Sequence, residues 1–330
     1  MMNYEIVKFL GNGNYGATYE AISTVNKTRT GIRTGIGAEI GGERGIARND
    51  VRNNDDRVAI KFIFPISGQK DYGLNEVQSY VKVAGTANNE DMSSPSCQFN
   101  LLCFHTAGEI TNSDGDYVTI FNMLEDVNVN KQLGHKLDPN ASIVYIVTDF
   151  LDGDDLSVII SNNNQRNIGP SEQTLGEFLS DILTALQYLH SKGISHRDIK
   201  PANIIRTRDG RFVLIDFGLV CHKPRCDAAG SPLYMSNELH MLGLSNTNFP
   251  LPMTAAADFF ALAISFFEYA TGDSFEYMAK FNNYGLYAVT SLPKLRLESE
   301  GLQRVYTKLL YDYNYISLIP DAIPQLLAQF

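Results

Sequence analysis

Apolar positions divide the chain into a first half that predicts strands and a second half that predicts helices. Segments rich in Ile, Val, Phe, Tyr and Thr, bounded by polar or Gly-rich stretches, are typical of strands. They predict strands over residues 3–10, 16–24, 57–65, 98–108 and 142–150.

Apolar residues spaced three and four apart predict helices. This spacing occurs over residues 73–84 and in a longer stripe over 175–189, which ends at Gly193. The rest of the second half is largely helical in pattern. We therefore predict an α+β fold in which a β-rich part and a mainly helical part meet near residue 150, without internal repeats.

Two polar stretches are longer than ordinary connections between elements. They cover about residues 26–56, rich in Gly, Arg and Asn, and 108–141, rich in Asn and Asp. We interpret both as insertions. The first is more simply a solvated linker than a surface that binds an acidic partner.

Composition limits the classes of function. The 330 residues carry 44% hydrophobic side chains, enough for a core, and exceed one usual domain. The net charge of −10 argues against nucleic-acid binding and mildly favours basic partners, although solubility is the plainer explanation. We expect a monomer.

The sequence predicts a cytoplasmic protein without a membrane span. Its start has no basic segment followed by an apolar one, and the apolar run over 255–272 contains Asp258 and Glu268. Four cysteines in a chain of this length do not form a disulfide scaffold, so we expect a reducing compartment. Cys221 and Cys226 are accordingly expected to be free thiols rather than zinc ligands, with a redox-sensitive disulfide between them as the alternative.

The segment SHRDIKPANIIRTRDGRFVLIDFG, residues 195–218, contains the most specific chemistry. Polar groups lead into a short apolar strand, a turn and a second strand, after which another acidic group follows. Asp198, Asn203 and Asp216 would thus lie at the ends of a hairpin. Such oxygen ligands suit a divalent cation bound to a polyanion.

Two weaker signals lie upstream. GNGNYG, residues 11–16, is followed by a strand pattern, so its glycines belong to a hairpin that could approach phosphate oxygens or form an ordinary turn. Lys61 lies within an apolar strand and needs a partner such as Glu76 on the next predicted helix.

These motifs, in this order, resemble the eukaryotic-type Ser/Thr protein kinase family. The Gly-rich turn, VAIK, the helix glutamate, HRDIKPAN, DFG and GSPLYMSNE follow one another between about residues 3 and 275. The resemblance implies a bilobal fold, with a β-rich N-lobe over 1–149 and a mainly helical C-lobe over 150–330.

The resemblance also implies catalytic roles and the cofactors ATP and Mg²⁺. Asp198 would orient the attacking hydroxyl as base, and Lys200 would neutralise the γ-phosphate. Asn203 and Asp216 would hold Mg²⁺, and a Lys61–Glu76 pair would hold the α- and β-phosphates. The residues implied to contact the nucleotide are Gly11, Asn12, Gly13, Gly16, Thr18, Ala59, Lys61, Thr148, Asp149, Leu151, Asp155 and Ile205.

The segment GSPLYMSNE, residues 230–238, implies a peptide substrate with a Ser or Thr acceptor. Ser231 would contact Asp198 and Lys200. Arg197 is of the type that binds an activating phosphate, yet residues 219–230 hold no Ser, Thr or Tyr. We hypothesise that Asp227 pairs with Arg197 in place of that phosphate; a solvated loop aspartate is the alternative.

Several positions depart from the family pattern. Ser236 and Asn237 replace the usual Ala-Pro before Glu238, and Phe260 replaces a tryptophan. The arginine that usually pairs with the glutamate is not evident, and Arg296 and Arg304 are the candidates. These changes concern substrate docking rather than phosphate chemistry.

His196, Phe217 and Tyr80 are predicted to be packing residues of the family's internal spine, so His196 is structural. Two other functions stay open. A pseudokinase that acts as a scaffold is disfavoured because Lys61, Asp198, Asn203 and Asp216 are all present. A small-molecule kinase is disfavoured by the peptide-receiving segment.

Overall fold

The structure, a computed structural model, divides into two compact units that we describe separately. The first unit comprises Met1–Leu74 and His105–Phe150, and the second Asn75–Phe104 and Leu151–Phe330. The structure describes residues 3–13, 15–24, 56–66, 70–85, 97, 99–130, 136–166, 168–236, 238–239, 249–273, 279–281, 287–289, 295–316 and 322–329. The predicted insertion over 26–56 lies outside the described residues except for Asp56.

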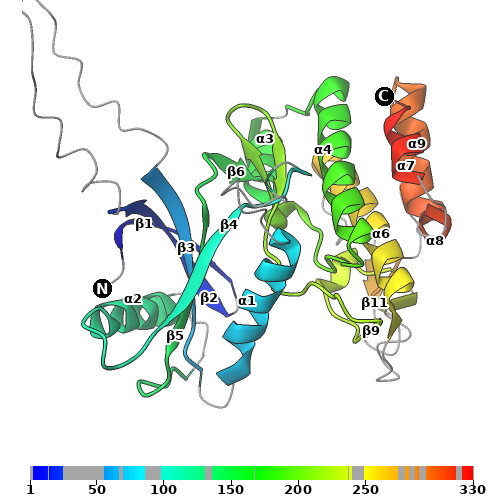
Figure 1. Ribbon diagram of the computed structural model, residues 1–330. Coiled ribbons are helices and arrows are strands. Elements are labelled where there is room, and N and C mark those ends of the chain that lie inside the picture. Colours follow the sequence, from blue (N-terminus) through cyan, green and yellow to red (C-terminus); the bar gives the residue numbers. More distant parts are fainter. Residues whose placement is uncertain are drawn as a thin grey trace, which may run out of the picture. The chain divides into compact units, whose positions relative to one another are not determined.

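The first unit is built on a five-stranded sheet (Figure 1). In spatial order the strands are β1 (Tyr4–Gly13), β2 (Gly16–Ser23), β3 (Arg57–Ile63), β5 (Ile143–Asp149) and β4 (Phe104–Ile110). β2 alternates Ala17, Tyr19 and Ala21 into the core, as the period of two along a strand requires. The strand predicted over 98–108 is present as β4 over 104–110. It thus starts and ends later in the sequence than its apolar pattern indicated.

Helix α2 (Tyr117–Asn130) covers one face of this sheet (Figure 1). Ile120 and Leu124 are buried in one cluster with Tyr19 and Phe62 of the sheet. The stretch that we interpreted as an insertion over 108–141 thus contributes to the core of the first unit. Its apolar residues have helical spacing, which the abundance of Asn and Asp obscured.

Helix α1 (Lys70–Ala84) follows β3. The predicted helix over 73–84 is therefore present and begins three residues earlier. Gly73 lies against Val144 of β5, where an added Cβ would be 2.9 Å from the nearest Val144 methyl carbon. This close approach explains the glycine in the first turns of the helix.

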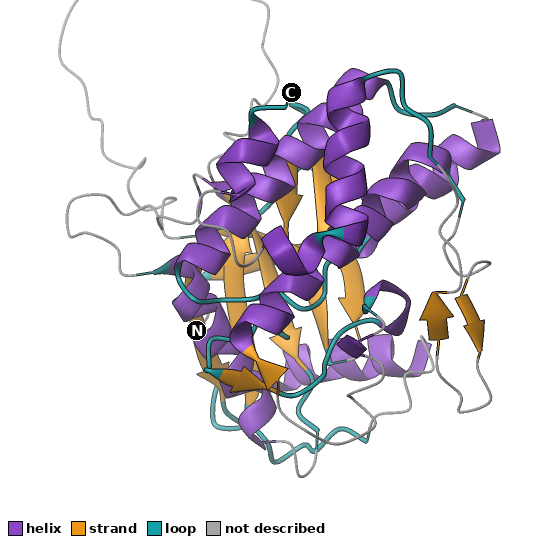
Figure 2. Ribbon diagram, turned by 90° about the vertical axis from the view of Figure 1, so that its right-hand side faces the viewer, coloured by secondary structure: helices purple, strands orange, loops and turns teal. Residues whose placement is uncertain are grey.

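The second unit is mainly helical. Its helices are α3 (Leu156–Arg166), α4 (Glu172–Ser191), α6 (Leu251–Thr271), α7 (Glu300–Tyr311), α8 (Tyr313–Ile316) and α9 (Ala322–Leu327). The stripe predicted over 175–189 is the buried face of α4, and Gly193 just after the helix has the left-handed φ of 67°. α4, α6 and α7 lie side by side (Figures 1 and 2).

Short strands complete the second unit. β6 (Gly153–Asp155), β7 (Ile204–Thr207) and β8 (Phe212–Leu214) form one sheet in that order. β9 (Arg225–Cys226) pairs with β10 (Phe249–Pro250), and β11 (Ala279–Phe281) pairs with β12 (Tyr287–Val289). The predicted α+β class, with strands first and helices second, is confirmed. No helix within the described ranges is long and apolar enough to cross a membrane.

Candidate active site

A polar loop between α4 and β7 is held in place by one carboxylate of α6. Asp258 accepts hydrogen bonds from the backbone nitrogens of His196 (2.8 Å) and Arg197 (2.7 Å) and contacts His190 Nε2 at 2.9 Å. Arg197 has a left-handed φ of 69°, which is uncommon for a residue with a side chain. The buried Asp258 therefore fixes a strained loop, as such loops at functional sites require.

His196 is a structural residue, as predicted. It is fully buried, its Nε2 lies 3.1 Å from the carbonyl oxygen of Ile215, and its ring packs edge-on against Phe217. Phe217 in turn contacts Tyr80, with the ring centroids 5.1 Å apart. Burial lowers the pKa of His196, against the opposing effect of nearby carboxylates such as Asp258. The result is a neutral imidazole that bridges two backbone segments.

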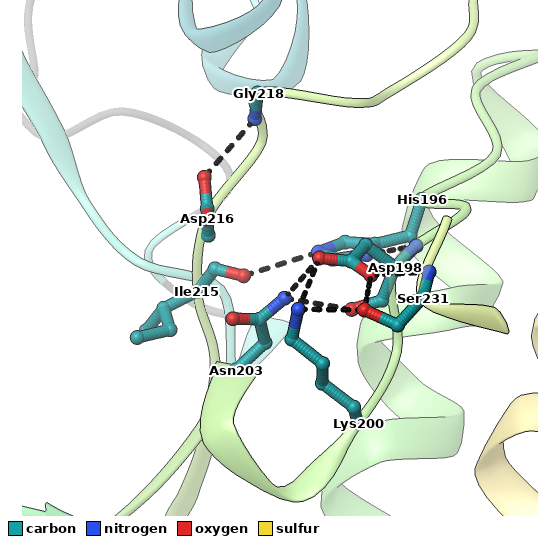
Figure 3. A network of polar contacts seen from close by, with 8 residues as sticks. All are labelled: His196, Asp198, Lys200, Asn203, Ile215, Asp216, Gly218 and Ser231. Atoms are coloured by element: carbon teal, nitrogen blue, oxygen red, sulfur yellow. Dashed lines mark hydrogen bonds and ion pairs between the residues drawn. The ribbon is translucent and has the colours of Figure 1, made fainter. Parts of the chain in front are cut away.

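The loop brings a carboxylate, an ammonium group, an amide and a hydroxyl together (Figure 3). Lys200 Nζ and Asn203 Nδ2 donate to Asp198 Oδ2 at 2.8 and 2.9 Å. The backbone nitrogen and hydroxyl of Ser231 donate to Asp198 Oδ1 at 3.0 and 2.7 Å. Lys200 Nζ also donates to Ser231 Oγ at 2.8 Å, which closes the ring of contacts. The predicted approach of Ser231 to Asp198 and Lys200 is thus present.

This ring fixes the orientation of the Asp198 carboxylate. The side chain of Asp198 is 8% exposed, so the desolvated carboxylate requires these donors. Asn203 also donates to the Asp198 backbone oxygen at 2.8 Å. Such an arrangement can hold an acceptor oxygen at a defined point, as general base catalysis requires.

Asp216 lies beside this ring but faces another direction. The Ile215 backbone nitrogen donates a hydrogen bond to the Asn203 backbone oxygen at 2.9 Å, which brings the two segments together. Asp216 has a left-handed φ of 63°, and its carboxylate points toward the Gly218 nitrogen, 3.3 Å away (Figure 3). The side-chain oxygen of Asn203 points away from Asp198 (Figure 3). These are hard oxygen ligands, so the donor set fits Mg²⁺.

Arg197 and Asp227 form the predicted ion pair. Arg197 Nη1 lies 2.9 Å from Asp227 Oδ1 and donates to the Asp227 backbone oxygen at the same distance. Arg197 Nε donates to the Leu219 oxygen at 2.6 Å. The arginine therefore joins both ends of the segment 219–227. The Asp227 side chain is 77% exposed, so water and salt weaken the pair.

One face of the first unit's sheet carries four of the predicted nucleotide contacts. Lys61 is opposite Thr18 on β2, and Ala59 is opposite Thr148 on β5. Because side chains alternate along a strand, these four share the face opposite the core cluster of Tyr19 and its neighbours.

The Gly-rich segment forms the predicted hairpin between β1 and β2. Gly11 pairs with Thr18, Asn12 with Ala17, and Gly13 with Gly16. A Cβ on Gly16 would lie 2.5 Å from the Phe62 oxygen, whereas none of the described atoms lies within 4 Å of a Cβ on Gly11 or Gly13. Among the described residues, packing against β3 thus requires a glycine at position 16 but not at 11 or 13.

The remaining predicted nucleotide contacts lie near residue 150. Asp149 ends β5 and contacts His105 Nε2 at 2.6 Å, and Leu151 begins the longer segment of the second unit. Asp155 is opposite Ile205 in the β6–β7 pair. One carboxylate oxygen of Asp155 accepts hydrogen bonds from the backbone nitrogens of Ser157 (3.0 Å) and Val158 (3.1 Å). Asp155 thus also caps α3.

Glu76 lies on α1 and is 2% exposed. A Cβ on Gly218 would be 3.4 Å from the Glu76 carboxyl carbon and 3.3 Å from Asp216 Oδ1, so Gly218 permits a close approach of α1 to this turn. The Lys61–Glu76 pair stays a prediction.

The expectation of free thiols at Cys221 and Cys226 is wrong in this structure, which pairs them as a disulfide. The short turn between Cys221 and β9 brings their Cα atoms to 6.3 Å, within the range for a disulfide. Cys97 and Cys103 are paired as well. The cysteine argument for a reducing compartment therefore loses its support.

Polar contacts between elements far apart in the sequence were not predicted. Tyr234, in the short helix η5 (Pro232–Tyr234), donates its hydroxyl to Glu268 of α6 at 2.7 Å. Asp181 of α4 accepts the Phe212 backbone nitrogen at 2.8 Å. In the sequence, the one local signal for such hydrogen bonds is a polar residue within an apolar stripe.

Comparison with known proteins identifies the family of this chain. The model of the protein kinase domain family matches residues 118–297, more than half of the chain. MAP kinase kinase MKK1/SSP32 of Saccharomyces cerevisiae is 33% identical over 138 residues, which cover 41% of this chain and 25% of that protein. Serine/threonine-protein kinase PknA of Nostoc sp. is 37% identical over 125 residues, 31% of this chain and 21% of its own.

Serine/threonine-protein kinase ULK3 of Xenopus laevis is 34% identical over 131 residues, which cover 36% of this chain and 27% of that protein. The chain thus spans about a quarter of the length of these relatives. The match of the family model and the ring of contacts around Asp198 lead to one conclusion: this chain belongs to the protein kinase family.

Proposed function

We propose that this protein is a serine/threonine protein kinase that transfers the γ-phosphate of ATP to hydroxyl groups of protein substrates. The observation that carries the proposal is the ring formed by Asp198, Lys200, Asn203 and Ser231. It holds a carboxylate and an ammonium group 2.8 Å apart, next to a segment suited to a peptide.

The chemistry needs orientation and charge neutralisation more than covalent participation by the protein. Asp198 accepts a hydrogen bond from the substrate hydroxyl and then its proton. The hydroxyl oxygen forms a bond to the γ-phosphorus while the bond to the β–γ bridging oxygen breaks. Lys200 neutralises the transferred phosphoryl group, and ADP leaves with the bridging oxygen.

Asn203 and Asp216 would hold Mg²⁺, which neutralises phosphate charge when bound. Lys61, with Thr18, Ala59 and Thr148 on the same sheet face, would bind the phosphates and the base of ATP. Gly11 and Gly13 leave space for phosphate oxygens to approach backbone nitrogens. Asp149, Leu151, Asp155 and Ile205 would complete the nucleotide site.

The test is transfer of labelled γ-phosphate from ATP and Mg²⁺ to basic proteins and Ser or Thr peptides, with protein from a host without kinases. We expect transfer, and we expect Asp198→Asn to lower it by at least about 100-fold while ATP binding remains. Nucleotide binding without transfer to any protein would favour a pseudokinase, and transfer only to small molecules would favour a metabolite kinase.

A further inference from the structure

Glu238 lies at the end of the predicted peptide-receiving segment. Among the described residues, it forms a hydrogen bond with a tyrosine rather than with an arginine. The Tyr313 hydroxyl donates to Glu238 Oε2 at 2.5 Å. Arg304, a candidate from the sequence, instead donates to Gln329 Oε1 at 3.0 Å. Tyr313 begins the short helix α8, 75 residues after Glu238.

Tyr313 contacts two residues at which the sequence departs from the family pattern, Ser236 and Phe260, as well as Glu238 itself. Its hydroxyl also forms a hydrogen bond with the side chain of Ser236, which is 2% exposed. Its ring packs edge-on against Phe260 of α6, with the centroids 5.4 Å apart. Phe260 stands in the position of the tryptophan, and Ser236 precedes Glu238 where the family has Ala-Pro.

The segment from Ser231 to Glu238 is fixed at three points. Ser231 is bonded to Asp198, and the Tyr234 hydroxyl is bonded to Glu268 of α6. The third point is the bond from Tyr313 to Glu238 and Ser236. A change at the third point therefore alters the orientation of a segment whose first residue contacts the proposed base.

We propose that Tyr313 is a positioning residue, which fixes the end of the segment 231–238 and thereby orders the surface that receives the peptide substrate. This inference rests on the proposed kinase function. It assigns to a tyrosine of α8 the task that an arginine performs in the family pattern. Only a protonated hydroxyl can donate to the carboxylate, and burial, followed by the bond to Glu238, raises the pKa of Tyr313.

The first experiment compares Tyr313→Phe with the unchanged full-length chain in steady-state phosphorylation of a Ser peptide. The phenylalanine keeps the ring on Phe260 and removes only the hydroxyl. We expect kcat/KM for the peptide to fall about tenfold through a higher KM, the factor that one charge-assisted hydrogen bond accounts for, with KM for ATP unchanged. Tyr311→Phe is the matched control, because the Tyr311 side chain is 65% exposed.

The second experiment alters the other partner. Glu238→Gln retains an oxygen that accepts the hydrogen bond and should stay within about threefold of the unchanged chain, whereas Glu238→Ala should match Tyr313→Phe. The double variant Tyr313→Phe with Glu238→Ala should be no worse than either single variant. Unchanged peptide KM in Tyr313→Phe, or effects that multiply in the double variant, would overturn the proposal.

Hydrogen exchange separates this inference from the proposed function. Backbone amides of Ser231 and of residues 233–236 should exchange faster in Tyr313→Phe than in Tyr311→Phe, whether or not the protein transfers phosphate. Equal exchange in the two variants would refute the anchoring role even if the kinase is active. A chain that transfers no phosphate but shows the difference would refute the kinase function alone.

Discussion

Arg197 joins a buried loop to an exposed one, and its environment differs at its two ends. Its backbone nitrogen is fixed by Asp258, while its guanidinium group holds Asp227 in the solvent. The backbone oxygens of Leu219 and Asp227 also accept from it. The side-chain charge of Asp227 is thus one of several contacts that order this segment.

We expect Asp227→Asn to lower kcat about two- to fivefold in protein that carries no phosphate. The asparagine keeps the backbone contact and an acceptor oxygen and removes only the charge, and an exposed pair contributes at most about 1 kcal/mol. The measurement is kcat with a Ser peptide, with mass spectrometry to verify the absence of phosphate. Asp227→Glu is the control that retains the charge. Equal kcat for the asparagine variant would leave Asp227 an ordinary solvated residue.

His196 makes the stability of the fold depend on pH. Its pKa is below 6.5 in the folded protein because it is buried, so the unfolded chain binds a proton first as pH falls. Its contribution is complete above pH 6.5 and is lost below it, by at most about 1.4 kcal/mol per pH unit.

We therefore expect His196→Phe to be less stable than the unchanged chain at pH 7.5 but to lose less of its free energy of unfolding between pH 7.5 and 5.5. Urea unfolding at both values measures this difference. His105→Phe is the control, because His105 lies on β4 of the first unit, outside the hydrogen-bonded loop around Asp198, and its side chain is 46% exposed. Parallel losses in His196→Phe and the unchanged chain would contradict the assignment.

At the scale of elements, α4 shows what the sequence could predict. Its apolar period and the glycine after its end are local signals, and both have their predicted places. The hairpin of β1 and β2 and the loop at Asp198 are also local. The α2 helix was missed because polar residues surround its narrow apolar stripe.

The contacts that no local pattern could predict join residues far apart in the chain. The Tyr313–Glu238 bond spans 75 residues, and the His190–Asp258 contact spans 68. Each depends on how two helices cross, which a single sequence does not encode in any short window. The site residues were thus predictable as members of motifs, and their supports were not.

Ser171 caps α4, because its side chain accepts the Thr174 backbone nitrogen at 3.2 Å. We expect Ser171→Ala to lower the free energy of unfolding by about 1 kcal/mol, since that nitrogen loses its partner. Ser171→Asp should retain the stability, because aspartate caps equally well. Chemical denaturation of the three proteins measures the effect, and equal midpoints would show that water replaces the cap without cost.

At the scale of the whole molecule, the net charge creates a field that acts on charged partners. The net charge of −10 is spread over a chain with 37 acidic and 27 basic side chains. A field of this sign concentrates cationic peptides and is screened within roughly 10 Å at 0.1 M salt.

We expect KM for a peptide rich in Lys or Arg to rise with NaCl, by about threefold or more between 0.05 and 0.5 M, whereas KM for a neutral peptide stays constant. Initial rates at fixed ATP measure both. If the two peptides respond alike, the acidic charge serves solubility only, which is the plainer explanation of the composition.

The hairpin of β1 and β2 separates two kinds of constraint on one motif. Gly16 is required by the neighbouring strand, while Gly11 and Gly13 have open space around their Cα atoms among the described residues. A mutation at Gly16 would therefore reduce the amount of folded protein in a cell. If Gly11 and Gly13 contact the nucleotide as proposed, a mutation at either would leave that amount normal and impair only catalysis. An inherited loss of the latter kind would yield abundant, folded, inactive molecules that still compete with active copies for their partners.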